Sequence, residues 1–184
     1  MSRPKTQTDE QVLDAALEIV REAGIGGLTF SKLAGRTGLS APTLVQRFAN
    51  KPVLIRRTLL RAWDLLEVRT RQLDRTLPPT AEGAIDLLVA LSGQYAGRDS
   101  FSGGLLLLSE DVRDADLSAR GAAWETQVVT ALNARLASGA ADDIGYALAE
   151  CWQGVVIWWA FTNSGRLEDH LRDRLSRFLR LVGR

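Results

Sequence analysis

The sequence predicts an all-α fold of about nine helices, and three observations support this prediction. Apolar residues recur at the three- and four-residue spacing of one helix face along most of the 184 residues. Residues that cap helices precede these segments, and glycine or proline follows several of them. No stretch alternates apolar and polar residues with an enrichment in β-branched side chains, as a half-exposed strand does.

Two helices are expected near the N-terminus. In TQTDEQVLDAALEIVREAG, Thr8 and Gln11 have the spacing of a capping box, and Gly24 ends the helix. After the turn GIGG, either Thr29 or Ser31 begins a short second helix through KLAGRT.

A third helix follows in GLSAPTLVQRFANK. Gly38 stops the second helix in the left-handed conformation, and Ser40 caps the third, with Pro42 in its first turn. At two turns this helix is too short to be stable alone, so it must be docked on its neighbours. A helical projection places Ala41, Leu44, Val45 and Phe48 on a face toward the core, and Pro42, Thr43, Gln46 and Arg47 on a free face.

The remaining helices are longer and end at clear breakers. Pro78 and Pro79 stop the fourth helix, which begins near residue 52 after Asn50. The expected helices are Pro52–Leu77, Thr80–Ala96, a short one across FSGGLLLLSED, Asp114–Ala137, Asp142–Asn163 and Leu167–Leu181.

Charge divides the chain unevenly. Residues 1–61 carry 10 basic and 5 acidic side chains, whereas the remainder carries 13 and 17. From Ala23 to Trp63 there are seven cations and no acid. Such a field is typical of a phosphate-binding face, although a solvated basic surface is the simpler alternative. We therefore expect a DNA-binding domain at residues 1–50 and a second helical domain at residues 51–184.

The first three helices form the pattern of a helix-turn-helix unit, whose final helix lies in the major groove of DNA. The free face of the third helix would then meet base edges and phosphates. Glutamine pairs well with adenine N6 and N7, and arginine pairs with guanine O6 and N7 or with phosphate. These roles are assigned to Gln46 and Arg47, respectively.

Other classes of function find little support. Catalysis normally needs a positioned base, a nucleophile or a metal, and the chain offers one histidine, His170, and one cysteine, Cys151. No catalytic residue, metal site or cofactor is expected, and Cys151 is interpreted as a buried small hydrophobe. Since no signal peptide or membrane-spanning run is found, the expected location is the cytoplasm.

The stretch LTFSKLAGRTGLSAPTLVQRFANKPVL resembles the helix-turn-helix of the TetR family of bacterial transcriptional repressors. The resemblance covers about residues 9–55 and implies nine or ten helices and a pocket whose ligand weakens DNA binding. A palindromic operator is expected separately, because a two-fold dimer reads a two-fold site. It also implies a homodimer through the helices near 142–163 and 167–181. The matching elements are Thr29, Leu33-Ala34, Gly38-Leu39-Ser40, Thr43-Leu44, Phe48, Asn50-Lys51 and Leu54.

The resemblance also assigns residues to DNA contacts, with one departure. Pro42 and Thr43 match positions that touch bases or phosphate, and Lys51 matches a phosphate-binding lysine. The family commonly has tyrosine where this chain has Val45, which cannot donate a hydroxyl to phosphate. The full expected set is Ser31, Lys32, Ser40, Pro42, Thr43, Gln46, Arg47 and Lys51.

The C-terminal half holds most of the aromatic residues, which either pack in an ordinary core or line a pocket for a small, mostly apolar effector. Gly145 and Ala149 are small enough for a partner helix to approach. A ligand-responsive repressor is the favoured function, with a ligand-independent architectural DNA-binding protein and an all-α enzyme as alternatives. The expected pocket residues are Tyr95, Phe101, Trp124, Gln127, Trp152, Trp158 and Phe161.

Overall fold

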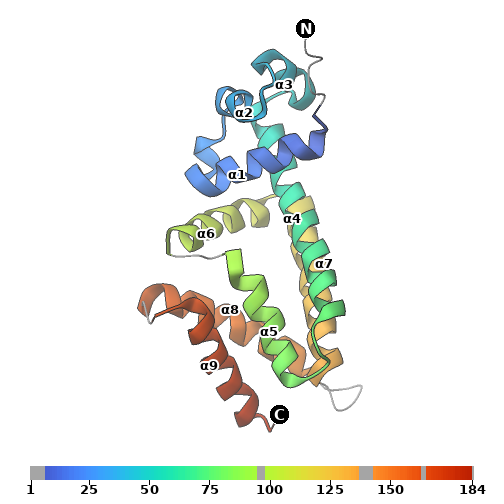
Figure 1. The fold of residues 1–184 in the computed structure, drawn as a ribbon, viewed down its shortest axis with the longest axis vertical. Coiled ribbons are helices and arrows are strands. Elements are labelled where there is room, and N and C mark those ends of the chain that lie inside the picture. The colour runs from blue at the N-terminus through green and yellow to red at the C-terminus, as the bar shows by residue number, and fades with distance from the viewer. Residues whose placement is uncertain (1–6, 95–97, 137–142, 163–164, 184) are drawn as a thin grey trace. The chain divides into compact units, whose positions relative to one another are not determined.

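A computed structural model describes residues 7–94, 98–136, 143–162 and 165–183 (Figure 1). Within these ranges every regular element is a helix, so the all-α prediction is confirmed. None of the described helices is both long and apolar enough to cross a membrane. The helices are α1 (Asp9–Gly27), α2 (Phe30–Thr37), α3 (Ala41–Phe48), α4 (Lys51–Thr76), α5 (Ala81–Leu91), the 3-10 turn η1 (Ser92–Gln94), α6 (Arg98–Arg113), α7 (Ala115–Leu136), α8 (Ile144–Thr162) and α9 (Leu167–Leu181).

The chain forms two compact units. Unit 1 comprises the residues up to Leu65 together with Gly103–Ser118, and unit 2 comprises Leu66–Ser102 and the residues from Ala119 onward. Unit 1 therefore holds α1, α2 and α3, the first part of α4 and most of α6. The division of the chain into domains at residues 50 and 51 stays a prediction.

The first helix begins at the predicted cap but continues beyond its predicted end at Gly24. The Gln11 amide donates to Thr8 Oγ1 at 3.2 Å, and the Thr8 amide donates to Gln11 Oε1 at 3.0 Å, which completes the predicted capping box. Gly24 has a φ of 68°, so the helical conformation is interrupted there, and one further turn carries α1 to Gly27. Glycine is suited to this left-handed position because it has no Cβ.

Helix α2 is also bounded by local chemistry. Thr29 Oγ1 accepts a hydrogen bond from the Lys32 amide at 3.2 Å, so Thr29 is the N-cap and Ser31 lies inside the helix. Gly38, with a φ of 73°, ends the helix and turns the chain toward α3, as predicted.

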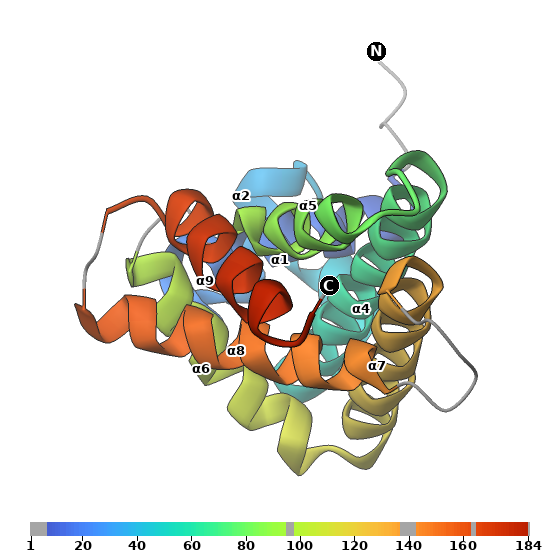
Figure 2. The same ribbon diagram turned by 90° about the horizontal axis from the view of Figure 1, so that it is seen from below.

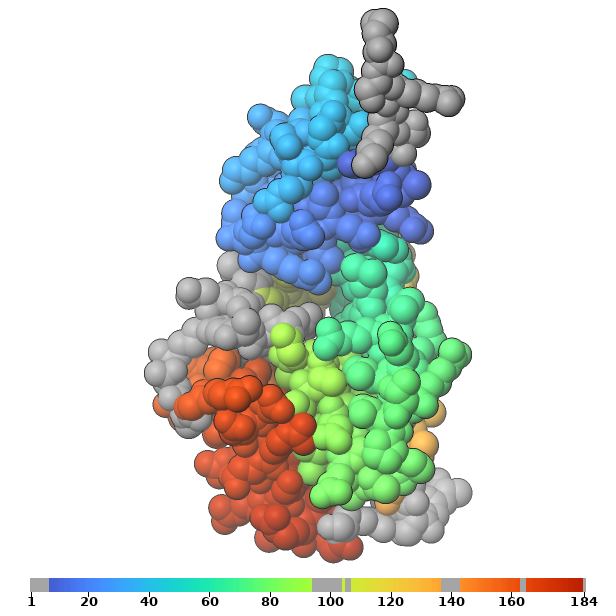
Figure 3. All heavy atoms as spheres, in the orientation of Figure 1, coloured from blue at the N-terminus to red at the C-terminus, as the bar shows by residue number. Residues whose placement is uncertain are grey.

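The core of unit 1 joins α1, α2, α3 and the start of α4. In Figure 3 the blue and cyan atoms of α1 to α3 pack into one continuous body. Seven side chains of this core have no exposed surface, and two of them belong to α3. Helix α3 is therefore stabilised by burial against its neighbours, because a helix of two turns has little stability of its own. The fully buried residues are Val12, Ala16, Leu28, Leu33, Leu44, Phe48 and Leu54.

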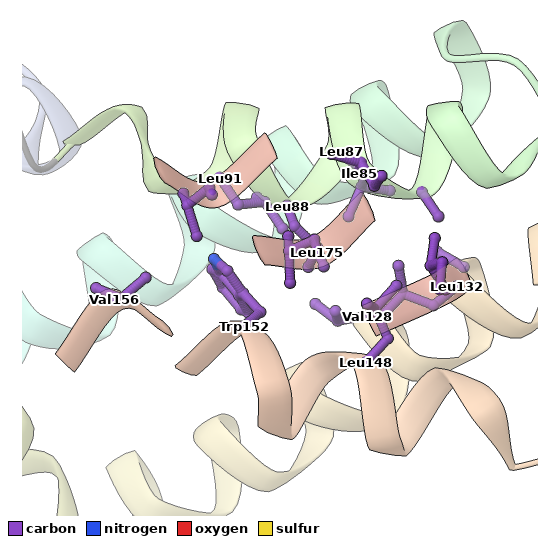
Figure 4. Close-up of a cluster of buried hydrophobic side chains, with 14 of the residues drawn as sticks. Ile85, Leu87, Leu88, Leu91, Val128, Leu132, Leu148, Trp152, Val156 and Leu175 are labelled. Carbon is purple, nitrogen blue, oxygen red and sulfur yellow. The ribbon is translucent and has the colours of Figure 1, made fainter. Parts of the chain in front are cut away.

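In unit 2, α9 packs against both α5 and α8 (Figure 2). Leucines at every fourth position of α9 are buried in this core. Figure 4 shows the ring of Trp152 from α8 directed toward Leu88 of α5 and Leu175 of α9. The Trp152 indole N–H donates to Ser92 Oγ at 2.8 Å, so the ring is buried without leaving its donor unpaired.

Helix α5 ends earlier than predicted, at Leu91 rather than Ala96, because the chain turns through η1. The Ser92 hydroxyl donates to the Leu88 carbonyl at 2.9 Å and accepts from Trp152. Ser92 is 2% exposed, so this pair of bonds fixes the end of α5 inside the core.

A half-buried carboxylate lies in unit 1 between α4 and α6. The Trp63 indole N–H donates to Asp111 Oδ1 at 3.3 Å. Burial raises the pKa of Asp111, and the nearby carboxylates of Asp114 and Glu110 add to this shift, while the bond from Trp63 opposes it. Ionised Asp111 is therefore a destabilising group in the folded chain.

Asp111→Asn should raise the melting temperature at pH 7 by about 2 °C, a figure reduced for the partial exposure of the site. A carboxyl with a raised folded pKa favours the fold at low pH, and this contribution is lost as the pH rises through the folded pKa. The gain from Asn should therefore fade as the pH falls below the unfolded value of about 3.9, and it should be nearly gone at about pH 3, where Asp111 is mostly protonated in both states. Thermal melts from pH 3 to 8 would check this, with Glu125→Gln on the exposed surface as the control. A gain that persists at pH 3 would contradict the role of ionisation.

Candidate nucleic-acid interface

Helix α3 begins at a well-formed cap. Ser40 Oγ accepts a hydrogen bond from the Thr43 amide at 3.2 Å, and the Ser40 and Thr43 hydroxyls lie 2.8 Å apart. Pro42 stands in the first turn, where its missing N–H leaves no helical bond unmade. The predicted start of the helix is thus confirmed, and both hydroxyls are already engaged with each other.

The exposed face of α3 differs from the helical projection. Leu44 and Phe48 are fully buried as predicted, but Val45 is 43% exposed, so its placement on the core face is wrong. The centre of the buried face lies between Leu44 and Phe48, and Val45 is about 80° from it at 100° per residue. Because the core covers less than half of the circumference, Val45 remains in solvent together with Pro42 and Gln46.

Arg47 lies about 80° from the centre of the buried face, on the side of α3 opposite Val45. Its side chain contacts the beginning of α1. Its Nη1 donates to the Gln7 carbonyl at 2.8 Å and lies 3.5 Å from Asp9 Oδ1. Its side chain is only 25% exposed. Direct base contact by Arg47 stays a prediction, and the contacts show a side chain that joins α3 to the first turn of α1.

Asp9, in the first turn of α1, also binds an arginine of α4. Arg57 Nη2 donates to Asp9 Oδ2 at 3.0 Å, and the Arg57 guanidinium lies 4.9 Å from the centre of the Phe48 ring. Arg61 of α4 donates to Asp14 Oδ1 at 2.7 Å. Two acids of α1, Asp9 and Asp14, therefore bind three arginines. In each pair the arginine lies 38 to 48 residues after the acid in the sequence.

Other arginines of the acid-free segment are paired as well. Arg36 Nη2 lies 2.6 Å from Glu22 Oε2, and this bond raises the pKa of Arg36 and lowers that of Glu22. Arg56 Nε donates to Asp114 Oδ2 at 2.9 Å, and its Nη2 contacts Asp116. The interpretation of this segment as a free cationic field is therefore wrong for its five arginines, because acids distant in the sequence neutralise them within unit 1.

The two lysines of the segment are arranged differently. Lys32 lies exposed on α2 next to Ser31, which is also exposed. Lys51 opens α4, and its Nζ donates to the Gly26 carbonyl at 3.2 Å while the residue stays half-exposed. Each ammonium has further N–H groups for a phosphate oxygen. Of the other residues predicted to contact DNA, Pro42 and Gln46 are exposed and Thr43 is half-buried. The DNA contacts of all these residues stay predictions.

The residues predicted to line a ligand pocket do not form one lining. Trp158 and Phe161 are 66% and 74% exposed, so their placement inside a pocket of this chain is wrong. They occupy the solvent side of α8, because its opposite side already supplies Trp152 and Trp159 to the core. Tyr95 and the side chain of Phe101 lie outside the described residues.

The two predicted residues of α7 pack against α4 inside unit 2. The Trp124 indole N–H donates to Thr70 Oγ1 at 2.9 Å, and its ring lies 6.2 Å from that of Trp152. Gln127 Nε2 donates to the Glu67 carbonyl at 3.2 Å. These contacts bind α7 to α4 and agree with the core-packing alternative for both residues.

Unit 2 contains a surface cleft that the sequence did not predict. Its volume is about 560 Å³, and it lies between the end of α5, η1 and the start of α9. Apolar walls from Val89, Trp159 and Leu171 adjoin the polar side chains of Arg166 and Glu168. No local sequence signal indicates this cleft, because its walls come from segments about 70 residues apart. Cys151 of α8 is half-buried, and burial raises the pKa of its thiol, which favours the unreactive protonated form.

The C-terminal part of α8 exposes large apolar side chains. Ile157, Trp158 and Phe161 are exposed, and the Trp158 and Phe161 rings lie 6.0 Å apart. Gly145 is used differently from its predicted role, because its amide donates to Asn133 Oδ1 at 2.8 Å. A Cβ at Gly145 would come within 2.5 Å of that oxygen, so α7 of the same chain, and not a partner helix, occupies the space beside it.

Known proteins share the N-terminal segment. Residues 12–58 match the family described as "Bacterial regulatory proteins, tetR family". Over 73 residues the chain is 44% identical to the tetracycline repressor protein class D of Escherichia coli and to the class H protein of Photobacterium damsela subsp. piscicida. This segment is 40% of the chain and 31% of each relative, so the match spans about a third of the length of these curated proteins.

Solved structures match almost the whole chain at lower identity. A transcriptional regulator from Saccharomonospora viridis in complex with choline aligns over 92% of this chain and 93% of its own, with a TM-score of 0.71 and 22% identity. A TetR-family regulator from Mesorhizobium loti aligns over 95% and 98%, with a TM-score of 0.65 and 18% identity. The multidrug binding protein EbrR with imidazole aligns over 94% and 95%, with a TM-score of 0.64 and 19% identity. At these identities the similarity shows a shared fold.

Proposed function

We propose, from the match of residues 12–58 to the tetR family of bacterial regulatory proteins, that this chain is a repressor of that family and binds a palindromic DNA operator as a homodimer. A small organic effector then releases it from the operator. The observation that carries this proposal is the capped, docked α3, whose exposed face lies within the family-matched residues 12–58. Regulation, and not catalysis, is the activity of this family.

The DNA-contacting surface comes from α2, α3 and the start of α4. In this proposal the exposed residues of α3, with Thr43, approach base edges in the major groove. Ser31, Lys32, Ser40 and Lys51 contact phosphates and set the position of α3 on the duplex. The DNA-binding domain is accordingly assigned to residues 1–50. Lys51, the first residue of α4, follows it directly.

The exposed apolar side chains of α8 support dimerisation through α8 and α9. Side chains as large as Trp158 and Phe161 are rarely left in water together, and aromatic residues are enriched at subunit interfaces. A two-fold dimer presents two copies of α3, which matches a two-fold operator.

The effector site is assigned to unit 2. The Saccharomonospora viridis regulator binds choline, and EbrR has been solved with malachite green and with proflavin. These relatives in fold support a small organic effector for this chain. The cleft beside Trp159 offers apolar walls with an arginine and a glutamate at its edge, as a site for such a molecule requires.

The test of the DNA-binding proposal is selection of duplexes from a randomised pool by the full-length protein, followed by titration of the selected site at several salt concentrations. We expect a palindromic site, a dimer at micromolar concentration, and affinity that falls steeply with salt. Equal binding of random and selected duplexes would favour the architectural alternative. A monomer at micromolar concentration would contradict the homodimer.

The test of the effector proposal uses choline and malachite green as probes. Binding is measured by calorimetry with and without the selected operator, and operator affinity is measured with and without the probe. Linkage requires both affinities to change by the same factor, typically about 5- to 150-fold. A probe that binds without changing operator affinity would contradict its role as an effector.

A further inference from the structure

The part of α3 that is free to approach DNA carries no charge. Gln46 lies opposite the buried face of the helix, and Pro42 and Val45 lie beside it, all three exposed. On the other flank, Thr43 is paired with Ser40, and the guanidinium of Arg47 is held at the start of α1. The free surface thus consists of two apolar side chains and one amide.

The Arg47 guanidinium is bound to the start of α1 through Nη1. Its Nη1 serves the Gln7 carbonyl and Asp9, and Asp9 is shared with Arg57, which also covers the Phe48 ring. Reaching a guanine with Nη1 would break these contacts with the first turn of α1. Arg47 therefore acts as a positioning residue that sets the orientation of α3.

An apolar side chain can recognise one group in the major groove. The C5-methyl of thymine is the apolar group that a base pair presents there, whereas guanine presents two acceptors that favour arginine or lysine. A glutamine amide pairs with the N6 and N7 of adenine. Both kinds of contact select A·T pairs.

We propose that Val45 and Pro42 read thymine C5-methyl groups and that Gln46 reads adenine, so that the base pairs under α3 are A·T. Val45 is in this way a specificity-determining residue at the position where a phosphate-binding tyrosine is absent. This inference rests on the proposed function, because it requires a specific operator. It adds the chemical identity of the bases that the operator presents to α3.

The experiment replaces each thymine of the selected operator in turn with deoxyuridine, which lacks only the C5-methyl group. Affinity should fall about fourfold at each thymine whose methyl is covered. Val45→Ala should weaken binding to the unmodified operator by a similar factor, and for that variant deoxyuridine at the Val45 position should cost less than about twofold. Val68→Ala serves as the matched control, since Val68 is an exposed valine outside the DNA-binding unit.

A second experiment tests the effect of the methyl group in a different base pair. A G·C pair placed at the Val45 position should bind better when its cytosine carries a C5-methyl, by about the same fourfold factor. Arg47→Ala should weaken the selected operator and its point variants by equal factors. It should leave the preferred sequence from a new selection unchanged.

The outcomes distinguish this inference from the proposed function. Failure to select any specific duplex would overturn the proposed function and this inference with it. A specific operator that tolerates deoxyuridine at every thymine, or that has G·C pairs under α3, would overturn the inference alone. A changed sequence preference in Arg47→Ala would restore base reading to Arg47 and contradict its positioning role.

Discussion

Phe48→Ala should lower the free energy of unfolding of unit 1 by about 3–5 kcal/mol. The Phe48 ring is fully buried and joins α3 to α1, α2 and α4, and the Arg57 guanidinium lies over its face. Truncation removes the apolar contacts of the ring and leaves a cavity between the four packed helices, into which close-packed neighbours relax only partly. Since a two-turn helix has little stability of its own, α3 should lose its fixed position.

The measurement is urea unfolding followed by circular dichroism, together with operator affinity. Val45→Ala is the control for stability on the same helix, since Val45 is exposed and its truncation should change stability by less than about 0.5 kcal/mol, and Val68→Ala is the control for operator affinity. Phe48→Leu keeps most of the volume and should recover part of the loss. A Phe48→Ala protein as stable as the control would show that the ring does not hold α3.

Arg135→Ala should destabilise unit 2 by about 3 kcal/mol. The Arg135 side chain is only 3% exposed and extends from α7 to the C-terminal end of α4. Its Nη1 donates to Asp74 Oδ1 at 2.5 Å, and its Nη2 donates to the carbonyls of Asp74 and Leu77 at 2.8 and 3.2 Å. The last carbonyls of a helix have no backbone N–H from a following turn to bond with, and Arg135 supplies the missing donors here. Alanine would leave these carbonyls without a hydrogen-bond partner from α7.

Urea unfolding of the variants would check this prediction. Asp74→Asn should cost at most about 1 kcal/mol, because the Asp74 carboxylate is 44% exposed and water can replace part of its ion pair. Arg177→Ala, an exposed arginine of α9, is the control for loss of a cation. An equal effect of Arg135→Ala and Arg177→Ala would show that the buried network contributes nothing.

Local chemistry in the sequence determined where the N-terminal helices begin and end. Thr8 with Gln11, Ser40 and Gly38 act on residues at most four positions away, so spacing alone predicts their bonds. The helix-turn-helix pattern follows from these boundaries and from the apolar residues between them. For the same reason the all-α fold was predictable without knowledge of any long-range contact.

Only the tertiary structure decided which side chains remain free on those helices. Arg57 meets Asp9 across 48 residues, and Arg56 meets Asp114 across 58, so no local pattern predicts that the basic segment is neutralised. The exposure of Val45 and the capture of Arg47 depend on how widely the core covers α3. The exposure of Trp158 depends likewise on which side of α8 meets α5 and α9. A helical projection defines angles between residues, but packing of distant segments determines which angles are buried, because burial is a property of neighbours that the local sequence does not contain.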